Sequence, residues 1–473
     1  MQQYAPTEAA QATGLFPSAA TRRAVDDRLT EALALADARA AQGSVTPSFD
    51  RAGFNQVLAA FDFATPRPLE DVLPWVIARL EDGITHLTHP RYFGLFNQQP
   101  SFPAQVADRL TAVFNPQLAT ATTSPVPVAM EAHVIRAVAA RAGLPDDASG
   151  HFTTGGAEAN ATALLCALTR ACPDFAEYGA RAFPGAPVLY VSKDSHLAWL
   201  KIAHQCGIGR ARVRLVGTDG MGRMDASILE AALAADSAEG RIPVMVAATA
   251  GTTNAGMIDP LEACAEIART HGAWFHVDAA WGGAVIASPF RRRLLKGIEH
   301  ADSVTIDAHK WFATTMGCGM FLIADPALLP AVFQVSTTYM PSNQANLDPY
   351  VNSMQWSRRF LGLRLFLALA TAGWDGYAAH VERSISLIAR LRTALHAHGW
   401  KIVNDSQMAV LCAVPPSGGS TAREIVTRVV TSGEAWISVA VFEGQEVVRA
   451  CVTHGQTDED DIETLVEALT APG

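Results

Sequence analysis

An aspartate and a lysine stand just beyond two successive apolar runs in the second half of the sequence. Asp278 follows residues 274–277, and Lys310 stands shortly after residues 303–306. A carboxylate can pair with a protonated pyridine nitrogen and keep the ring cationic, so that the ring accepts electrons from a carbanion, and the small Ala280 leaves room for such a ring. A lysine amine partly withdrawn from water can condense with an aldehyde. The pair therefore favours a cofactor that is both a pyridine and an aldehyde, pyridoxal 5′-phosphate (PLP).

Each of these two residues also has a simpler interpretation. An aspartate after a strand often caps the following helix, and an isolated lysine is normally a solvated surface residue. However, Asp278 and Lys310 are separated by about one strand–helix–strand unit. Adjacent parallel strands would then deliver both side chains to one pocket, which favours the cofactor site.

Three further segments place small or polar residues beyond a predicted strand. Gly155 and Gly156 precede a predicted helix, where backbone N–H groups can bind a phosphate, although a glycine pair is also common in plain turns. His196 follows residues 188–191, and its flat imidazole suits either stacking on a ring or a surface loop. Thr253 carries a hydroxyl that can bond a ring substituent or a phosphate. Because parallel sheets bind ligands at the carboxyl ends of their strands, we expect these residues at one site.

The elements that must position these residues alternate between β-rich runs and helices. Strands are expected at residues 188–191, 244–248, 274–277, 304–306 and 320–323, with helices at 158–171 and 261–270. This alternation predicts a mostly parallel sheet covered by helices, hence the α/β class.

The parts of the chain that flank this α/β region show a different sequence pattern. Apolar residues recur at helical spacing in residues 21–41 and 69–80 before the region, and helices are also expected at 358–370 and 377–398 after it. A mixture of strands and helices then follows, with strands at 409–414, 436–441 and 446–452 and helices near 421–430 and after 457. We therefore expect an N-terminal helical segment (residues 1–89), a large α/β domain (90–357) and a small α+β domain (358–473).

Composition excludes several classes of protein. With 49% hydrophobic and 17% charged residues, the 473-residue chain can bury the cores of two or three domains. Its net charge of −10 argues against nucleic acid or an anionic membrane as partner, because such partners need clustered cations. The seven cysteines are scattered, without a C-x-x-C pair, which indicates reduced thiols, no metal site and a cytoplasmic protein. We find neither a signal peptide nor an apolar run of ~18 residues that would span a membrane.

Taken together, these motifs make the chain resemble the group II PLP-dependent decarboxylases, which act on aromatic amino acids, glutamate and 2,4-diaminobutyrate. The resemblance runs from about residue 89 to residue 469 and implies fold type I, the aspartate-aminotransferase-like fold of PLP-dependent transferases. The segments that carry it are His89-Pro90-Arg91-Tyr92-Phe93, Ser124-Pro125, Gly155-Gly156-Ala157-Glu158-Ala159-Asn160, His276-Val277-Asp278-Ala279-Ala280, Asp307-Ala308-His309-Lys310-Trp311 and Ser357-Arg358-Arg359-Phe360.

The resemblance implies a role for each residue at the strand ends. Lys310 would form the internal aldimine, Asp278 would hold the pyridinium nitrogen and His196 would stack on the ring. The remaining cofactor contacts would come from Gly156, Ala157, Thr253, Ala280, Asp307 and His309. The implied reaction removes the α-carboxylate of an L-amino acid as CO₂ through a quinonoid intermediate and leaves the amine.

Proton return and substrate choice are implied to depend on other residues. In the family, a loop tyrosine returns a proton to Cα, and relatives that lack it form aldehydes oxidatively. We assign this tyrosine to Tyr350, with Tyr339 as the alternative. Either tyrosine could also simply pack within the loop. Arg449 matches an arginine that meets a substrate carboxylate in glutamate decarboxylases, and also suits a surface position. Phe96 falls where the aromatic-acid branch has an aromatic pair, whereas Arg91 resembles the glutamate branch, so we expect a substrate other than a large aromatic one.

Two other functions remain open at this point. The first keeps PLP and changes the product, as in an aminotransferase or an oxygen-consuming aldehyde synthase. The second is a scaffold that keeps the fold without the chemistry, which the full set of cofactor residues disfavours. The resemblance also implies a homodimer with active sites at the subunit interface, in which the N-terminal helices would wrap the partner.

Overall fold

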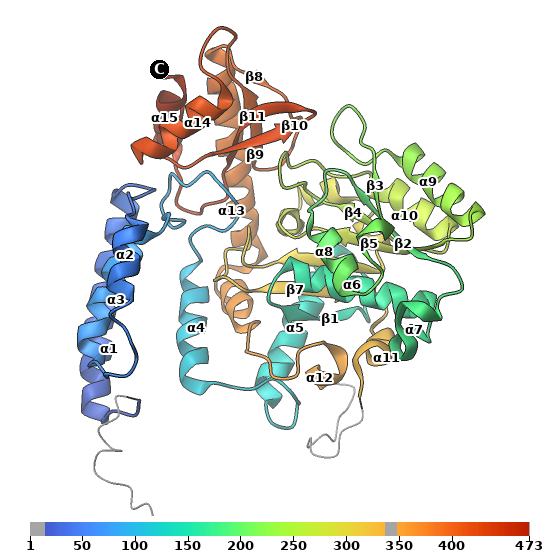
Figure 1. Cartoon of the computed structure of the whole chain (residues 1–473), viewed down its shortest axis with the longest axis horizontal. Coiled ribbons are helices and arrows are strands. Elements are labelled where there is room, and N and C mark those ends of the chain that lie inside the picture. Colours follow the sequence, from blue (N-terminus) through green and yellow to red (C-terminus); the bar gives the residue numbers. More distant parts are fainter. Residues whose placement is uncertain (1–14, 336–347, 473) are drawn as a thin grey trace, which may run out of the picture.

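A seven-stranded sheet forms the centre of the computed structural model, which describes residues 15–335 and 348–472 (Figure 1). The strand order is β1-β7-β6-β5-β4-β2-β3. From β3 to β6 all neighbours are parallel, whereas β7 is antiparallel to both β6 and β1. The strands are β1 (Ser149–Thr153), β2 (Pro187–Ser192), β3 (Val213–Val216), β4 (Ile242–Thr249), β5 (Trp274–Asp278), β6 (Ser303–Asp307) and β7 (Gly319–Ile323). The predicted, mostly parallel sheet is therefore present.

Helices cover both faces of this sheet, which explains why its strands are continuous apolar runs rather than alternating ones. Along β2, Val188 and Tyr190 belong to one hydrophobic core, and Leu189 and Val191 belong to the other. Every residue of β2, β5, β6 and β7 is buried. The helices of this domain are α4 (Phe102–Phe114), α5 (Pro125–Ala142), α6 (Gly156–Ala171), α7 (Phe175–Tyr178), α8 (Ala198–Gln205), α9 (Ala226–Ala238), α10 (Leu261–Thr270), α11 (Leu329–Phe333) and α12 (Pro349–Asn352).

The C-terminal part forms a second, antiparallel sheet of order β10-β11-β9-β8, which lies beside α14 and α15 (Figure 1). The long helix α13 joins this part to the large sheet. The elements are α13 (Leu363–Ala397), β8 (Lys401–Ile402), β9 (Val410–Val414), α14 (Ala422–Ser432), β10 (Ser438–Phe442), β11 (Gln445–Cys451) and α15 (Glu459–Thr470). The domain boundaries at residues 89 and 357 stay a prediction. Tyr92 and Phe93, at the start of the predicted large domain, pair with Trp436 of the predicted small domain.

Two helix predictions need correction. Residues 358–362, expected to begin a helix, precede α13 and are not helical. The two helices expected at 358–370 and 377–398 form the single element α13, in which Gly373 has a φ of 64° and interrupts the helical backbone. The short strands β3 and β8 were not predicted, because neither offers an apolar run long enough to stand out from its surroundings.

The first three helices, α1 (Ala19–Gln42), α2 (Arg51–Leu58) and α3 (Leu69–Gly83), contribute no buried residue. Figure 1 shows them in blue along one side of the molecule, beside α4. In the described part of the chain, no helix combines the length and the apolar character that crossing a membrane would require. All seven cysteines are free thiols, as the scattered pattern predicts.

Candidate active site

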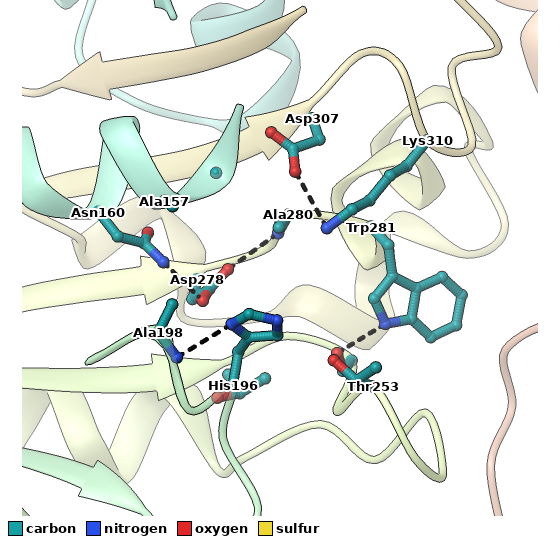
Figure 2. Close-up of a pocket in the computed structure, with 13 residues that line it drawn as sticks. Ala157, Asn160, His196, Ala198, Thr253, Asp278, Ala280, Trp281, Asp307 and Lys310 are labelled. Carbon is teal, nitrogen blue, oxygen red and sulfur yellow. Dashed lines mark hydrogen bonds and ion pairs between the residues drawn. The ribbon is translucent and has the colours of Figure 1, made fainter. Parts of the chain in front are cut away.

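A cavity opens at the carboxyl ends of β4, β5 and β6, beside the first turn of α6 (Figure 2). Its empty volume, including the solvent-open mouth, is about 450 Å³. The position is the one at which a parallel sheet is expected to bind its ligand. The residues that line the cavity are Gly156, Ala157, Asn160, His196, Ala198, Thr249, Gly251, Thr253, Asp278, Ala280, Trp281, Asp307 and Lys310.

Asp278 ends β5 and places an oriented carboxylate in this cavity. Its side chain is buried, with one oxygen accepting from Asn160 Nδ2 at 2.9 Å and the other from the backbone N–H of Ala280 at 3.2 Å. These donors replace part of the solvation that the carboxylate loses on burial. Each carboxylate oxygen keeps acceptor capacity for a further donor in the cavity.

Lys310 follows β6 in a turn, and its ammonium lies 3.0 Å from a carboxylate oxygen of Asp307, the last residue of that strand. The other oxygen of Asp307 is buried and has no hydrogen-bond partner in the described part of the chain. Lys310 and Asp278 therefore line one cavity because β5 and β6 are adjacent and parallel. Figure 2 shows that Asp278 and Lys310 reach it from neighbouring strand ends.

The N-terminus of α6 forms a second wall of the cavity. Gly156 is its first residue, and a Cβ there would lie 3.0 Å from an oxygen of Asp307 and 3.3 Å from Cβ of Ala280. A larger residue would thus crowd this corner, whereas glycine leaves the first N–H groups of the helix open to a ligand. Free N–H groups at the positive end of a helix bind anions such as phosphate.

His196 and Thr253 line the remaining sides. The Nδ1 atom of His196 accepts the backbone N–H of Ala198 at 3.2 Å, so the proton of the neutral ring is on Nε2. Figure 2 shows the imidazole across the cavity from Asp307. Trp281 encloses the site from a third direction and is fixed by a 2.7 Å hydrogen bond from its indole N–H to the carbonyl of Gly251.

Four predicted site residues do not line the cavity. His309 is buried behind it, with its ring bonded to the carbonyl of Cys318, and burial lowers its pKa. Phe96 stacks on Trp281 with 4.2 Å between ring centroids. The other two are Arg449, which contacts the backbone of Thr253, and Tyr350 in α12.

Arg449 is 2% exposed, so the alternative of a plain surface arginine is wrong. Its guanidinium lies 5.0 Å from the centre of the Phe96 ring and donates to the carbonyls of Gly94, Thr253 and Asn254. Its Nη2 atom is buried without a hydrogen-bond partner among the described residues. A buried guanidinium with an unused donor suits a carboxylate ligand.

Tyr350 is buried against Trp356, with ring centroids 5.1 Å apart, and its backbone N–H donates to the carbonyl of Ala119. This places it outside the cavity lining of its own chain. Tyr339, the alternative, lies outside the described residues.

Asn160 and Trp281 line the cavity without having been predicted there. Asn160 lies one helical turn after Gly156, so both residues lie on the same face of α6. Trp281 follows Ala280 directly. Asn160 ends the motif that contains Gly156, and Trp281 follows the motif that contains Asp278. Their places in or beside these motifs could have indicated that they line the site.

The chemistry of this donor set fits PLP. The lysine amine suits the aldehyde, the carboxylate of Asp278 suits the ring nitrogen, and the helix N-terminus beside Gly156 suits the phosphate. An independent sign is the buried carboxylate oxygen of Asp307 that has no hydrogen-bond partner among the described residues, because it can accept from a polar group of a ligand.

Comparisons with known proteins support the same conclusion. Residues 62–413 match the model of the "Pyridoxal-dependent decarboxylase conserved domain". The chain is 33% identical over 353 residues to the acidic amino acid decarboxylase GADL1 of Bos taurus, covering 72% of this chain and 67% of that protein. It is 34% identical over 339 residues to the cysteine sulfinic acid decarboxylase of Mus musculus, covering 70% and 68%.

Solved structures share the whole fold. The apo form of mouse CSAD superposes with a TM-score of 0.88 at 27% identity and covers 95% of this chain and 98% of that one. Oryza sativa TDC, solved with PLP and tryptamine, gives a TM-score of 0.89 at 23% identity, covering 96% and 98%, and this likeness concerns the fold alone. The predicted fold type I is confirmed. The chain belongs to the family of pyridoxal-dependent decarboxylases and is a PLP-dependent amino acid decarboxylase.

Proposed function

We propose that the cavity at the ends of β4, β5 and β6 is the active site, in which an L-amino acid loses its α-carboxylate. The observation that carries this proposal is that Lys310 and Asp278, a basic and an acidic side chain, line the same cavity. Adjacent parallel strands bring them together. PLP, when bound, supplies a cationic ring that accepts the electrons of the broken Cα–carboxylate bond.

The residues of the chain bind and orient around that ring. Lys310 would hold the aldehyde carbon, and Asp278 would keep the ring nitrogen protonated through the negative charge that its buried hydrogen bonds stabilise. His196 would lie against the ring, and the first N–H groups of α6, at Gly156 and Ala157, would hold the phosphate. The enclosing indole of Trp281 limits water at the reacting carbon, which favours proton return from a positioned group.

Replacing the lysine tests the assignment. We expect Lys310→Ala to abolish the covalent cofactor adduct that borohydride traps on this residue, and to lower the rate of CO₂ release about a thousandfold or more. Lys201→Ala, on the exposed side of α8, is the control and should behave as wild type. CO₂, amine and hydrogen peroxide are measured together for each common amino acid. Adduct on another lysine would contradict the site, peroxide formation would indicate an aldehyde synthase, and a product that keeps its carboxylate would indicate an aminotransferase.

We further propose that the substrate is an amino acid with an acidic side chain whose carboxylate meets Arg449. The buried Nη2 donor without a partner among the described residues supports this, as does the bond from the guanidinium to the backbone carbonyl of Thr253, a residue that lines the cavity. Two similar relatives are named for acidic amino acids and for cysteine sulfinic acid. The ring of Phe96 stacks on Trp281, so Phe96 packs against Arg449 and does not offer an open surface for an aromatic substrate side chain.

For Arg449→Gln, we expect kcat/KM for the preferred acidic substrate to fall about ten- to a hundredfold, because a charge-assisted hydrogen bond is lost. Arg449→Lys should recover part of it. The control is Arg392→Gln, which removes a similar pair of bonds to the backbone carbonyls of Asn404 and Ser406 in the same domain. Equal losses for acidic and neutral amino acids, or the same loss in the control, would refute the assignment.

Proton return to Cα is assigned to Tyr350, with Tyr339 as the alternative. Because Tyr350 is buried against Trp356 outside the cavity, this role requires its side chain to leave that packing. We expect Tyr350→Phe, assayed in air, to lower amine yield and to raise the share of aldehyde and hydrogen peroxide, because a carbanion that is protonated more slowly can be oxidised by O₂. Product partition is compared with Tyr339→Phe and with the exposed control Tyr178→Phe. An unchanged partition in Tyr350→Phe excludes this residue, and a change in Tyr339→Phe alone transfers the role.

We also propose a cytoplasmic homodimer. Helices α1, α2 and α3 bury no residue, and exposed apolar surface of this kind marks interaction sites, so we infer that a second copy covers these helices. Large apolar side chains are exposed on α1, α3 and the adjacent α4: Leu33, Leu35, Val76, Leu80, Leu110, Val113 and Phe114. The seven free thiols support the cytoplasmic location.

Charge placed on α4 tests the dimer. We expect the wild-type protein to sediment as a dimer and the double variant Val113→Glu/Phe114→Glu to sediment as a monomer, because both side chains are more than three-quarters exposed in one chain and would be buried in the pair. The control Phe290→Glu, at a residue that is 72% exposed and lies outside these helices, should remain dimeric. A monomeric wild-type protein would contradict the proposal, as would a double variant that stays dimeric.

A further inference from the structure

A chain of buried hydrogen bonds runs from the interior of the sheet to Asp278. Trp274 and Ser303 begin it, with the indole nitrogen 2.7 Å from the hydroxyl oxygen, and that oxygen lies 2.8 Å from Nδ1 of His276. His276 Nε2 lies 3.0 Å from Oδ1 of Asn160, whose Nδ2 lies 2.9 Å from the carboxylate of Asp278. All five side chains are buried, so water does not complete their bonding.

The direction of every bond in this chain follows from its last member. An ionised carboxylate only accepts, so Asn160 must present its NH₂ group to Asp278 and its carbonyl oxygen to His276. That oxygen needs a donor, which requires the proton of His276 to be on Nε2. Burial lowers the pKa of His276 to about 4, so at neutral pH the ring is uncharged and carries a single N–H.

The other end of the chain agrees with this tautomer. With its proton on Nε2, His276 has a bare Nδ1, which must accept the hydroxyl proton of Ser303. Ser303 in turn accepts from the indole of Trp274, a group that can only donate. The longer contact of 3.4 Å between His276 Nε2 and the hydroxyl of Thr305 is compatible with the same N–H. Every donor thus points toward Asp278, and reversing any one bond would leave a buried group unsatisfied.

We propose that His276 and Asn160 are positioning residues that keep Asp278 ionised and turned toward the ring nitrogen of the cofactor. The neutral Nε2–H tautomer of His276 fixes the orientation of the Asn160 amide, and that amide stabilises the negative charge of the carboxylate. Neither residue touches the reacting carbon. The inference rests on the proposed function in one respect, the assignment of Asp278 to the ring nitrogen.

Replacement of His276 separates this role from simple packing. In His276→Phe the Asn160 amide loses the donor that orients it and can turn its oxygen toward Asp278, which then needs a proton of its own. We expect PLP labelled with ¹⁵N at the ring to show loss of ring-nitrogen protonation, and PLP affinity to fall about three- to tenfold. His276→Gln, whose amide can still donate to Asn160, should restore both. The matched control is His151→Phe, a buried histidine of β1 whose two ring nitrogens have no partner among the described residues.

A second measurement determines the tautomer of His276 in the wild-type chain. Wild-type apoprotein labelled with ¹⁵N-histidine should show His276 with a protonated Nε2 and a bare Nδ1 at neutral pH, the signal being assigned by its absence in His276→Gln. A proton on Nδ1 would overturn the proposal, as would full ring-nitrogen protonation and unchanged PLP affinity in His276→Phe. Failure of the proposed function would appear differently, as the absence of a cofactor adduct on Lys310, while the apoprotein tautomer would remain readable.

Discussion

The parallel pairing of β5 with β6 is the constraint on which the site depends. Parallel strands end at the same edge of a sheet, so β5 and β6 both end there, with Asp278 opposite Thr305 and Asp307 two residues further along. The turn after Asp307 returns Lys310 to the same edge. The carboxylate of Asp278 and the amine of Lys310, which a PLP ring needs at its opposite ends, thus come from the ends of neighbouring strands. Slipping either strand by one residue would move its side chains to the other face of the sheet.

Two carboxylates in one small cavity are costly, and the structure balances them differently. Asp278 receives two neutral donors, which leave it free to meet a cation of the ligand. Asp307 is paired with the ammonium of Lys310, and its second oxygen has no hydrogen-bond partner in the described residues. Burying a carboxylate oxygen without a partner costs free energy, so this corner of the site lowers the stability of the fold.

Much of the fold and the centre of the site could be predicted from the sequence. Strand ends can be located in the sequence because buried parallel strands are apolar runs. Polar residues just beyond those runs, such as His196 and Asp278, are then recognisable as candidates for the site. What could not be predicted depends on contacts between distant segments. The covering of Phe96 by Trp281, the burial of Arg449 behind Thr253 and the bond from Asn160 to Asp278 arise from packing that no spacing rule encodes.

A crystal structure of the chain with PLP bound would decide whether Lys310 and Asp278 hold the cofactor. We expect continuous density between Nζ of Lys310 and the aldehyde carbon of the cofactor, with the carboxylate of Asp278 at hydrogen-bonding distance from the ring nitrogen. Cofactor bound in another cavity, or a ring nitrogen that faces some other group while Asp278 points away, would contradict this assignment.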